Sequence, residues 1–264
     1  MRVTVLGSGT AIPNGDRFPA GYLVEHGATR AMVDCGPGTL RRLAQAGCDL
    51  AALDAVLLTH YHTDHCADLA ALLFALRSPR YAGRAPLQLY GAPGLERLLQ
   101  RLLEAWPWLD RALAAAGRHE LTPGEFAVGD LAVAAIPIRH TAQSLGFRIA
   151  AAGRTVAFSG DADECDELVD LARNADLFVC DAATPDGQKL DGHLTPGLAG
   201  AYAARAGAHH LALTHFYPEC EGHDLHAMAA TRFCGRITVA EDLAMLTPEP
   251  GSAAGTQVGA RPGR

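Results

Sequence analysis

The chain has 264 residues, of which 49% are hydrophobic, and this length is enough for one compact domain with its own core. Its 22 basic and 29 acidic side chains give a formal net charge of −7, which disfavours a protein dedicated to binding extended nucleic acids. No apolar run approaches the roughly 20 residues that cross a bilayer, and Gly7 interrupts the first apolar run, so we expect no membrane partner and no signal peptide. The seven cysteines include no C-x-x-C pair and favour reduced thiols and a cytoplasmic location.

Short apolar runs alternate with amphipathic stretches along the chain, which predicts an α/β protein. We expect strands over residues 3–6, 22–24, 31–33, 55–59, 87–90, 131–138, 145–149, 155–159, 177–180 and 211–214. We expect helices over residues 39–46, 69–77, 95–105, 165–172, 198–206 and 225–233. One domain is assigned to residues 1–247. A disordered tail is predicted at 248–264, where Gly, Ala and Pro dominate without a periodic apolar face.

The densest group of chemistry-bearing side chains follows the apolar run 56–58, in the pattern H-x-H-x-D-H formed by His60, His62, Asp64 and His65. Neutral imidazoles and carboxylates are ligands of zinc and similar cations. Alternate residues of an extended segment share a face, so His60 and His62 are expected to share one ion. Asp64 and His65 are then expected to face a second ion. The segment predicts a metal site without identifying a reaction.

Three further candidate ligands lie just beyond the carboxyl ends of predicted strands: His140, Asp161 and His215. Open α/β sheets place their binding sites at such strand ends, so these segments are expected to meet around one pocket.

Together with Asp34, these residues resemble the five sequence landmarks of the metallo-β-lactamase superfamily, in the same order. The resemblance implies a four-layered αββα sandwich with two mixed β-sheets and two metal ions at the edge between the sheets. It implies that the first ion is held by His60, His62 and His140, and the second by Asp64, His65 and His215. Asp161 would bridge the ions, and Asp34 would orient the ligand loop. Zinc is the expected metal, although the ligand chemistry also allows manganese or iron.

Three short motifs resemble the ribonuclease Z-like branch of this superfamily: Asp34-Cys35-Gly36-Pro37-Gly38-Thr39, Ser144-Leu145-Gly146-Phe147 and Gly192-His193-Leu194-Thr195. The third aligns with a histidine motif of that branch. His193 is therefore our candidate for the general acid that protonates the leaving alkoxide of a phosphodiester. The alternative is an exposed histidine ahead of the helix start at Thr195-Pro196.

Two features depart from ribonuclease Z proteins. Their P-x-K-x-R-N loop, which engages the tRNA 3′ region, is replaced here by residues 13–18, which have neither the lysine nor the final asparagine. Only 21 positions separate His140 from Asp161, which leaves room for a hairpin but not for a long tRNA-binding arm. We therefore predict a phosphodiesterase for small phosphodiesters such as cyclic nucleotides or short oligonucleotides. The alternatives are a lactone or thioester hydrolase on the same metal site and a tRNA 3′-processing endonuclease with a different arm.

The predicted mechanism uses two cations to polarise the phosphoryl group, with Asp64 orienting or deprotonating the attacking water. Aromatic side chains beside ligand positions are candidates for stacking on a base: Phe147, Tyr61, Phe216 and Tyr217. The family resemblance also implies a homodimer.

Overall fold

The computed structural model of the chain describes residues 1–250, whose strands form two seven-stranded sheets. The first sheet has the order β14 (Met245–Leu246), β1 (Arg2–Gly7), β2 (Gly21–His26), β3 (Thr29–Val33), β4 (Ala55–Leu57), β5 (Gln88–Gly91) and β6 (Gly117–Glu120). The second sheet has the order β13 (Arg236–Val239), β12 (His210–Thr214), β11 (Leu177–Asp181), β10 (Arg154–Phe158), β9 (Leu145–Ala151), β8 (Leu131–Pro137) and β7 (Gly124–Val128). Both sheets combine parallel and antiparallel pairs. In the first sheet, β3 runs parallel to β4 and antiparallel to β2. In the second sheet, β10 runs parallel to β11 and antiparallel to β9.

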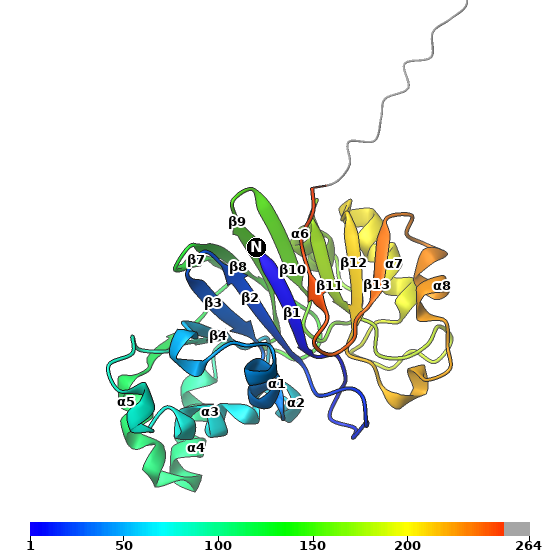
Figure 1. The fold of residues 1–264 in the computed structure, drawn as a ribbon. Coiled ribbons are helices and arrows are strands. Elements are labelled where there is room, and N and C mark those ends of the chain that lie inside the picture. The colour runs from blue at the N-terminus through cyan, green and yellow to red at the C-terminus, as the bar shows by residue number, and fades with distance from the viewer. Residues whose placement is uncertain (251–264) are drawn as a thin grey trace, which may run out of the picture.

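Helices cover the outer face of each sheet (Figure 1). The first sheet carries α1 (Thr39–Gln45), α3 (Asp68–Ala75), α4 (Leu95–Ala105) and α5 (Asp110–Ala115), with the short α2 (Thr63–Cys66) next to α3. The second sheet carries α6 (Glu167–Ala172), α7 (Pro196–Ala206) and α8 (Leu225–Ala230). The predicted αββα sandwich with two mixed β-sheets is therefore confirmed.

Three hydrophobic clusters lie between the four layers, which explains why the strands are apolar on both faces. In β4, Ala55 and Leu57 point into the cluster between the sheets, whereas Val56 points into the cluster under α3 and α4. The same alternation puts Val156 and Phe158 of β10 between the sheets. Because successive side chains of a strand face opposite sides, each strand joins two layers of core.

Local signals in the sequence define several element ends. The β2–β3 hairpin turns at Gly27, which has a φ of 54°, a left-handed conformation that glycine adopts without a steric penalty. Helix α7 begins where the Thr195 side chain accepts a hydrogen bond from the N–H of Leu198, and Pro196 occupies its first position. It ends at Gly207, with a φ of 66°.

The structure differs from the predicted elements mainly at their ends and at the sheet edges. The helices predicted over 69–77, 165–172 and 225–233 are the shorter α3, α6 and α8. The sequence does not predict the edge strands β6, β7, β13 and β14 or helix α5. Strands β6, β7 and β13 contain polar residues and lack a continuous apolar run, and β14 has only two residues. Most of the tail predicted at 248–264 lies outside the described residues, which end at 250. Within residues 1–250, no helix combines the length and apolar character that a membrane span requires.

Candidate metal centre

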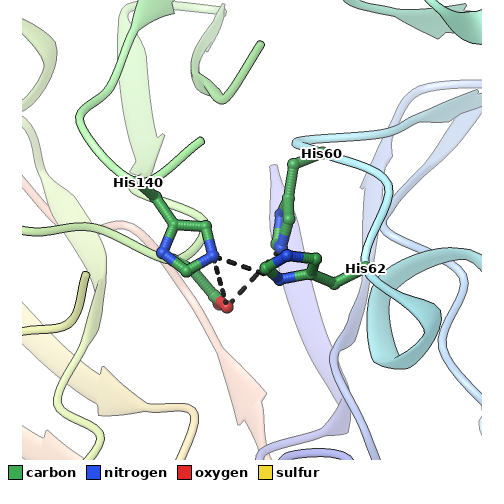
Figure 2. Close-up of side chains that lie close together, drawn as sticks. His60, His62 and His140 are labelled. Carbon is green, nitrogen blue, oxygen red and sulfur yellow. Dashed lines mark hydrogen bonds and ion pairs between the residues drawn. The ribbon is translucent and has the colours of Figure 1, made fainter. Parts of the chain in front are cut away.

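The predicted metal ligands come together at the carboxyl ends of four strands. His60 and His62 follow β4, His140 follows β8, Asp161 follows β10 and His215 follows β12. Figure 2 shows the imidazoles of His60, His62 and His140 pointing toward one another. The topology therefore assembles one site from both sheets, as the strand-end pattern predicts.

The ligand atoms form two adjacent groups. One consists of His60, His62, His140 and Asp161, and the other of Asp64, His65 and His215; within each group, one ligand atom per residue lies within 4.8 Å of the others. The Asp161 carboxylate lies between them. Its Oδ2 is 3.6 Å from the Nε2 atoms of both His60 and His140, and its Oδ1 is 3.0 Å from His65 Nε2 and 3.3 Å from His215 Nε2.

Several of these buried polar atoms have no hydrogen-bond partner among the described residues: His60 Nε2, His65 Nε2, both ring nitrogens of His215 and Asp161 Oδ1. Buried polar groups in native proteins are nearly always paired, because an unpaired one keeps the full cost of desolvation. Metal ions accept electron pairs from nitrogen and oxygen atoms of this kind. The cluster is thus compatible with a dinuclear metal site.

Asp34 orients two of the imidazoles. Its Oδ2 lies 2.8 Å from Nδ1 of His65, and because a carboxylate only accepts, His65 donates from Nδ1, so its neutral form has the lone pair on Nε2. The Thr59 hydroxyl donates to Asp34 (2.9 Å) and lies 3.1 Å from Nδ1 of His60, which therefore donates to it. Asp34 itself is held at a φ of 60°, uncommon for a residue with a side chain. Both imidazoles thus direct Nε2 into the cluster.

The electrostatics of the cluster suit cation binding. Burial, reinforced by the nearby His65, lowers the pKa of His60 to about 2, so this imidazole is in the neutral form that binds metals. Burial opposes ionisation of Asp161, but His215 and His65 outweigh it and hold the pKa of this carboxyl well below its usual value. Burial would lower the pKa of His65, but the carboxylates of Asp161 and Asp34 outweigh it and raise this pKa well above its usual value. The same buried carboxylates provide the negative potential that a divalent cation requires.

Asp64 lies at the edge of the cluster near the loop that follows β1. Its Oδ2 accepts a hydrogen bond of 3.1 Å from the N–H of Ala11 and lies 3.8 Å from Nε2 of His65. The backbone of the first loop thereby fixes one carboxylate oxygen of Asp64.

His193 also lies at the cluster and is buried, not exposed. Its ring stacks on that of His215, with centroids 5.3 Å apart and an interplanar angle of 13°, and its Nδ1 donates to Asp181 Oδ2 at 3.0 Å. Burial alone would lower the pKa of His193, but the hydrogen bond to Asp181 outweighs it and raises the pKa above the usual value. One of the ring nitrogens of His193 lies within 4.8 Å of a ligand atom of Asp161 and of His215.

Asp181 is a site residue that the sequence reasoning missed. It is fully buried at the end of β11, where Oδ2 accepts from His193 and from the N–H of Ala162 (3.0 Å). A signal was present: Asp181 directly follows the predicted strand 177–180, as the candidate ligand Asp161 follows an earlier predicted strand.

Three of the aromatic side chains that are candidates for stacking on a base make packing contacts within the protein. Phe147 has no exposed surface and lies in the core between the sheets. Tyr61 donates its hydroxyl to the carbonyl of Ala92 and packs against the core under the outer helices. Phe216 is 4% exposed and is covered by the guanidinium of Arg17, 4.6 Å from the ring centroid.

Tyr217 is the aromatic residue that does lie at the site. Its ring stands edge-on to His193 and His215, with centroid distances of 5.7 and 6.0 Å. It is therefore the aromatic side chain best placed beside the cluster.

Comparison with known proteins agrees with this fold and site. Residues 29–216 match the family described as the beta-lactamase superfamily domain. The ribonuclease Z of Mycobacterium bovis (strain BCG / Pasteur 1173P2) is 34% identical over 278 residues, covering 95% of this chain and 99% of that protein. The structure of the metallo-β-lactamase fold protein YhfI from Bacillus subtilis has a TM-score of 0.83 and 27% identity, covering 93% of this chain and 99% of that chain.

The short form of human tRNase Z has a TM-score of 0.76 and 26% identity, covering 94% of this chain and 100% of that chain. These matches extend over both sheets and all the ligand segments. The chain therefore belongs to the metallo-β-lactamase superfamily and is a metal-dependent hydrolase whose relatives include proteins named ribonuclease Z.

Proposed function

We propose that this chain is a metal-dependent phosphodiesterase that cleaves RNA, with the 3′ region of tRNA precursors as its substrate. The observation that carries the phosphodiester assignment is the His193–Asp181 pair beside the metal cluster. The choice of RNA is supported by the relatives named ribonuclease Z, which match nearly the whole chain. They favour this alternative over the small phosphodiesters that the sequence predicts.

We assign His60, His62 and His140 to a first ion, Asp64, His65 and His215 to a second, and Asp161 to both. Zinc fits this set of imidazoles and carboxylates without thiolates. When bound, two such ions supply a positive charge that lowers the pKa of water and stabilises the charge that develops on a phosphoryl group.

The chain's own residues supply proton transfer. We assign the acid role to the doubly protonated form of His193: Asp181 holds the proton on Nδ1, and the second proton, on Nε2, is the one that passes to the departing alkoxide oxygen. Asp64 Oδ2 is engaged by Ala11, which leaves Oδ1 as the atom that we assign to the proton of the attacking water. In this assignment, Asp64 accepts the proton of the attacking water and His193 supplies the proton of the leaving group.

A second candidate is hydrolysis of small phosphodiesters, and the fixed loop after β1 favours it. Asn14 donates to Glu221 at 2.7 Å, and Arg17 donates to the Ser8 hydroxyl at 2.7 Å and to the carbonyl of Ala240 at 2.5 Å. The side chains of Asn14 and Arg17 are therefore engaged by other residues of this chain. Between His140 and Asp161 the chain forms only β9, β10 and their short connections.

The experiment that tests the proposal is a substrate panel for zinc- and manganese-loaded protein: a tRNA precursor, 3′,5′-cyclic AMP, bis(p-nitrophenyl) phosphate, a homoserine lactone and a thioester. We expect cleavage of the tRNA precursor near its 3′ end and of bis(p-nitrophenyl) phosphate. Cyclic AMP turnover without RNA cleavage supports the second candidate. Lactone or thioester turnover without diester turnover overturns both, because an easily expelled leaving group does not need the His193–Asp181 pair.

A further inference from the structure

Lys189 is the only lysine of the chain, although there are 22 basic residues. It lies in the segment between β11 and α7 that also contains His193. Its Nζ is 2.7 Å from Oδ1 of Asp163, and the side chains of Lys189 and Asp163 are 31% and 10% exposed. The pair is therefore only partly open to solvent, where a charge-assisted hydrogen bond is stronger than at a free surface.

Asp163 connects the three segments that contain site residues. Its Oδ2 accepts from the N–H of Gly192 at 3.0 Å, and its own N–H donates to the carbonyl of Arg139 at 2.7 Å. It therefore joins its own segment, just after Asp161, to the segment of His140 and to that of His193.

Gly192 transmits this contact to two site histidines. Its carbonyl lies 2.8 Å from Nδ1 of His140, and a carbonyl only accepts, so His140 donates from Nδ1 and presents Nε2 to the cluster. His193 is the next residue in the chain. Gly192 has a φ of 85°, and a Cβ placed there would lie 3.0 Å from His140 Nδ1, so this peptide has little freedom to reorient.

We propose that Lys189 and Asp163 are positioning residues that fix the tautomer of His140 and the placement of His193 through Gly192. The inference rests on the proposed roles of these two histidines. Lysine suits the position because a compact ammonium has three donors, and a second contact of 3.4 Å joins Nζ to the carbonyl of Leu190. Loss of the charge frees Asp163 to turn away from Gly192, and both histidines then lose a defined orientation.

Four variants test the proposal: Lys189→Met, Lys189→Arg, Asp163→Asn and a matched control, Arg205→Met. Lys189→Met keeps the aliphatic stem and removes the charge, whereas Lys189→Arg keeps the charge. The control removes the ion pair of 2.7 Å between Arg205 and Asp166, which lies outside the site.

The first measurement is metal affinity, from zinc titration against a chromophoric chelator. Removing groups that orient metal ligands typically lowers affinity by 10- to 100-fold. We expect a loss of this order for one of the two zinc ions in Lys189→Met and Asp163→Asn, affinity close to wild type in Lys189→Arg, and no change in Arg205→Met.

The second measurement is the ¹⁵N spectrum of the histidine rings in the metal-free protein, with the His140 signals assigned from a His140→Gln variant. In the wild type we expect neutral His140 to be the Nδ1–H tautomer. In Lys189→Met and Asp163→Asn we expect a mixture of tautomers.

Wild-type zinc affinity and an unchanged His140 spectrum in both Lys189→Met and Asp163→Asn overturn the inference, as does an equal loss in Arg205→Met. Neither measurement requires turnover. A protein that binds zinc as expected but cleaves no phosphodiester would therefore overturn the proposed function and leave this test intact.

Discussion

The Oδ2 atom of Asp34 lies 2.8 Å from Nδ1 of His65, and the same oxygen accepts from the Thr59 hydroxyl that lies beside His60. One buried carboxylate thus sets the tautomer of an imidazole in each half of the cluster. Asp34 binds no ion in this assignment, yet it controls the direction in which two Nε2 lone pairs point.

Asp34→Asn should therefore weaken metal binding while keeping the ligands in place. An amide nitrogen facing Thr59 or His65 no longer accepts, so we expect an affinity loss of about 10- to 100-fold for zinc. Calorimetric titration of the metal-free protein measures it. Wild-type affinity in a folded Asp34→Asn variant would contradict the orienting role.

Asp161→Ala should reduce the number of bound ions. Its two oxygens face different groups, at 3.6 Å from His60 and 3.0 Å from His65, so no other residue replaces it in both. We expect loss of at least one metal ion per chain, measured by plasma emission spectroscopy on protein dialysed against buffered zinc. Retention of both ions would refute its assignment to a shared position.

His193→Gln and Asp181→Asn should slow the cleavage of diesters that have poor leaving groups. General acid catalysis contributes typically 10²- to 10⁴-fold, so kcat for RNA should fall by that order. The loss should be much smaller for bis(p-nitrophenyl) phosphate, since p-nitrophenolate departs without a proton. Metal content serves as the control; if His193→Gln loses an ion, the residue is a ligand and not an acid.

Asp242 should be important for stability because it holds the first loop. Its side chain is 4% exposed, accepts from the N–H (3.0 Å) and hydroxyl (2.8 Å) of Ser8 and from the N–H of Phe18 (2.8 Å), and pairs with Arg42 at 3.2 Å. Asp242→Ala leaves these donors and the Arg42 charge unpaired, which should cost about 3 kcal/mol in the free energy of unfolding.

Urea denaturation measures this cost, and the exposed neighbour Glu241 gives a matched control. Glu241→Ala should change stability by less than about 0.5 kcal/mol. Equal effects of the two substitutions would show that the contacts of Asp242 are not specific.

His210 should make stability depend on pH. Burial, with a smaller effect of Arg236, lowers its pKa to about 4, whereas the unfolded chain has the ordinary value near 6.5. The folded state therefore prefers neutral His210. This contribution, up to roughly 3 kcal/mol, is present above pH ~6.5 and lost as the pH falls toward 4.

His210→Gln keeps a polar group near the Thr238 hydroxyl, which lies 2.8 Å from His210 Nε2, and removes the titration. Urea denaturation at several pH values should show a steeper loss of stability for the wild type than for the variant between pH 6.5 and 4. Parallel curves would contradict the prediction, because all other histidines are common to both proteins.

The sequence alone determined the general fold and which ligand-type side chains meet in the cluster. The spacing of His60, His62, Asp64 and His65 and the strand-end positions of His140, Asp161 and His215 depend on local order along the chain. Alternating apolar runs likewise predicted the main strands, because a strand buried on both faces must be apolar over its length.

Only the tertiary structure decided which side chains face the site. Phe147 and Tyr217 both lie near ligand positions in the sequence, but strand alternation turns Phe147 into the core, and the loop after β12 places Tyr217 beside His193. The His193–Asp181 and Lys189–Asp163 pairs join residues 12 and 26 positions apart. Such contacts depend on where loops from different strands meet in space, and no periodic pattern in the sequence predicts which loops meet.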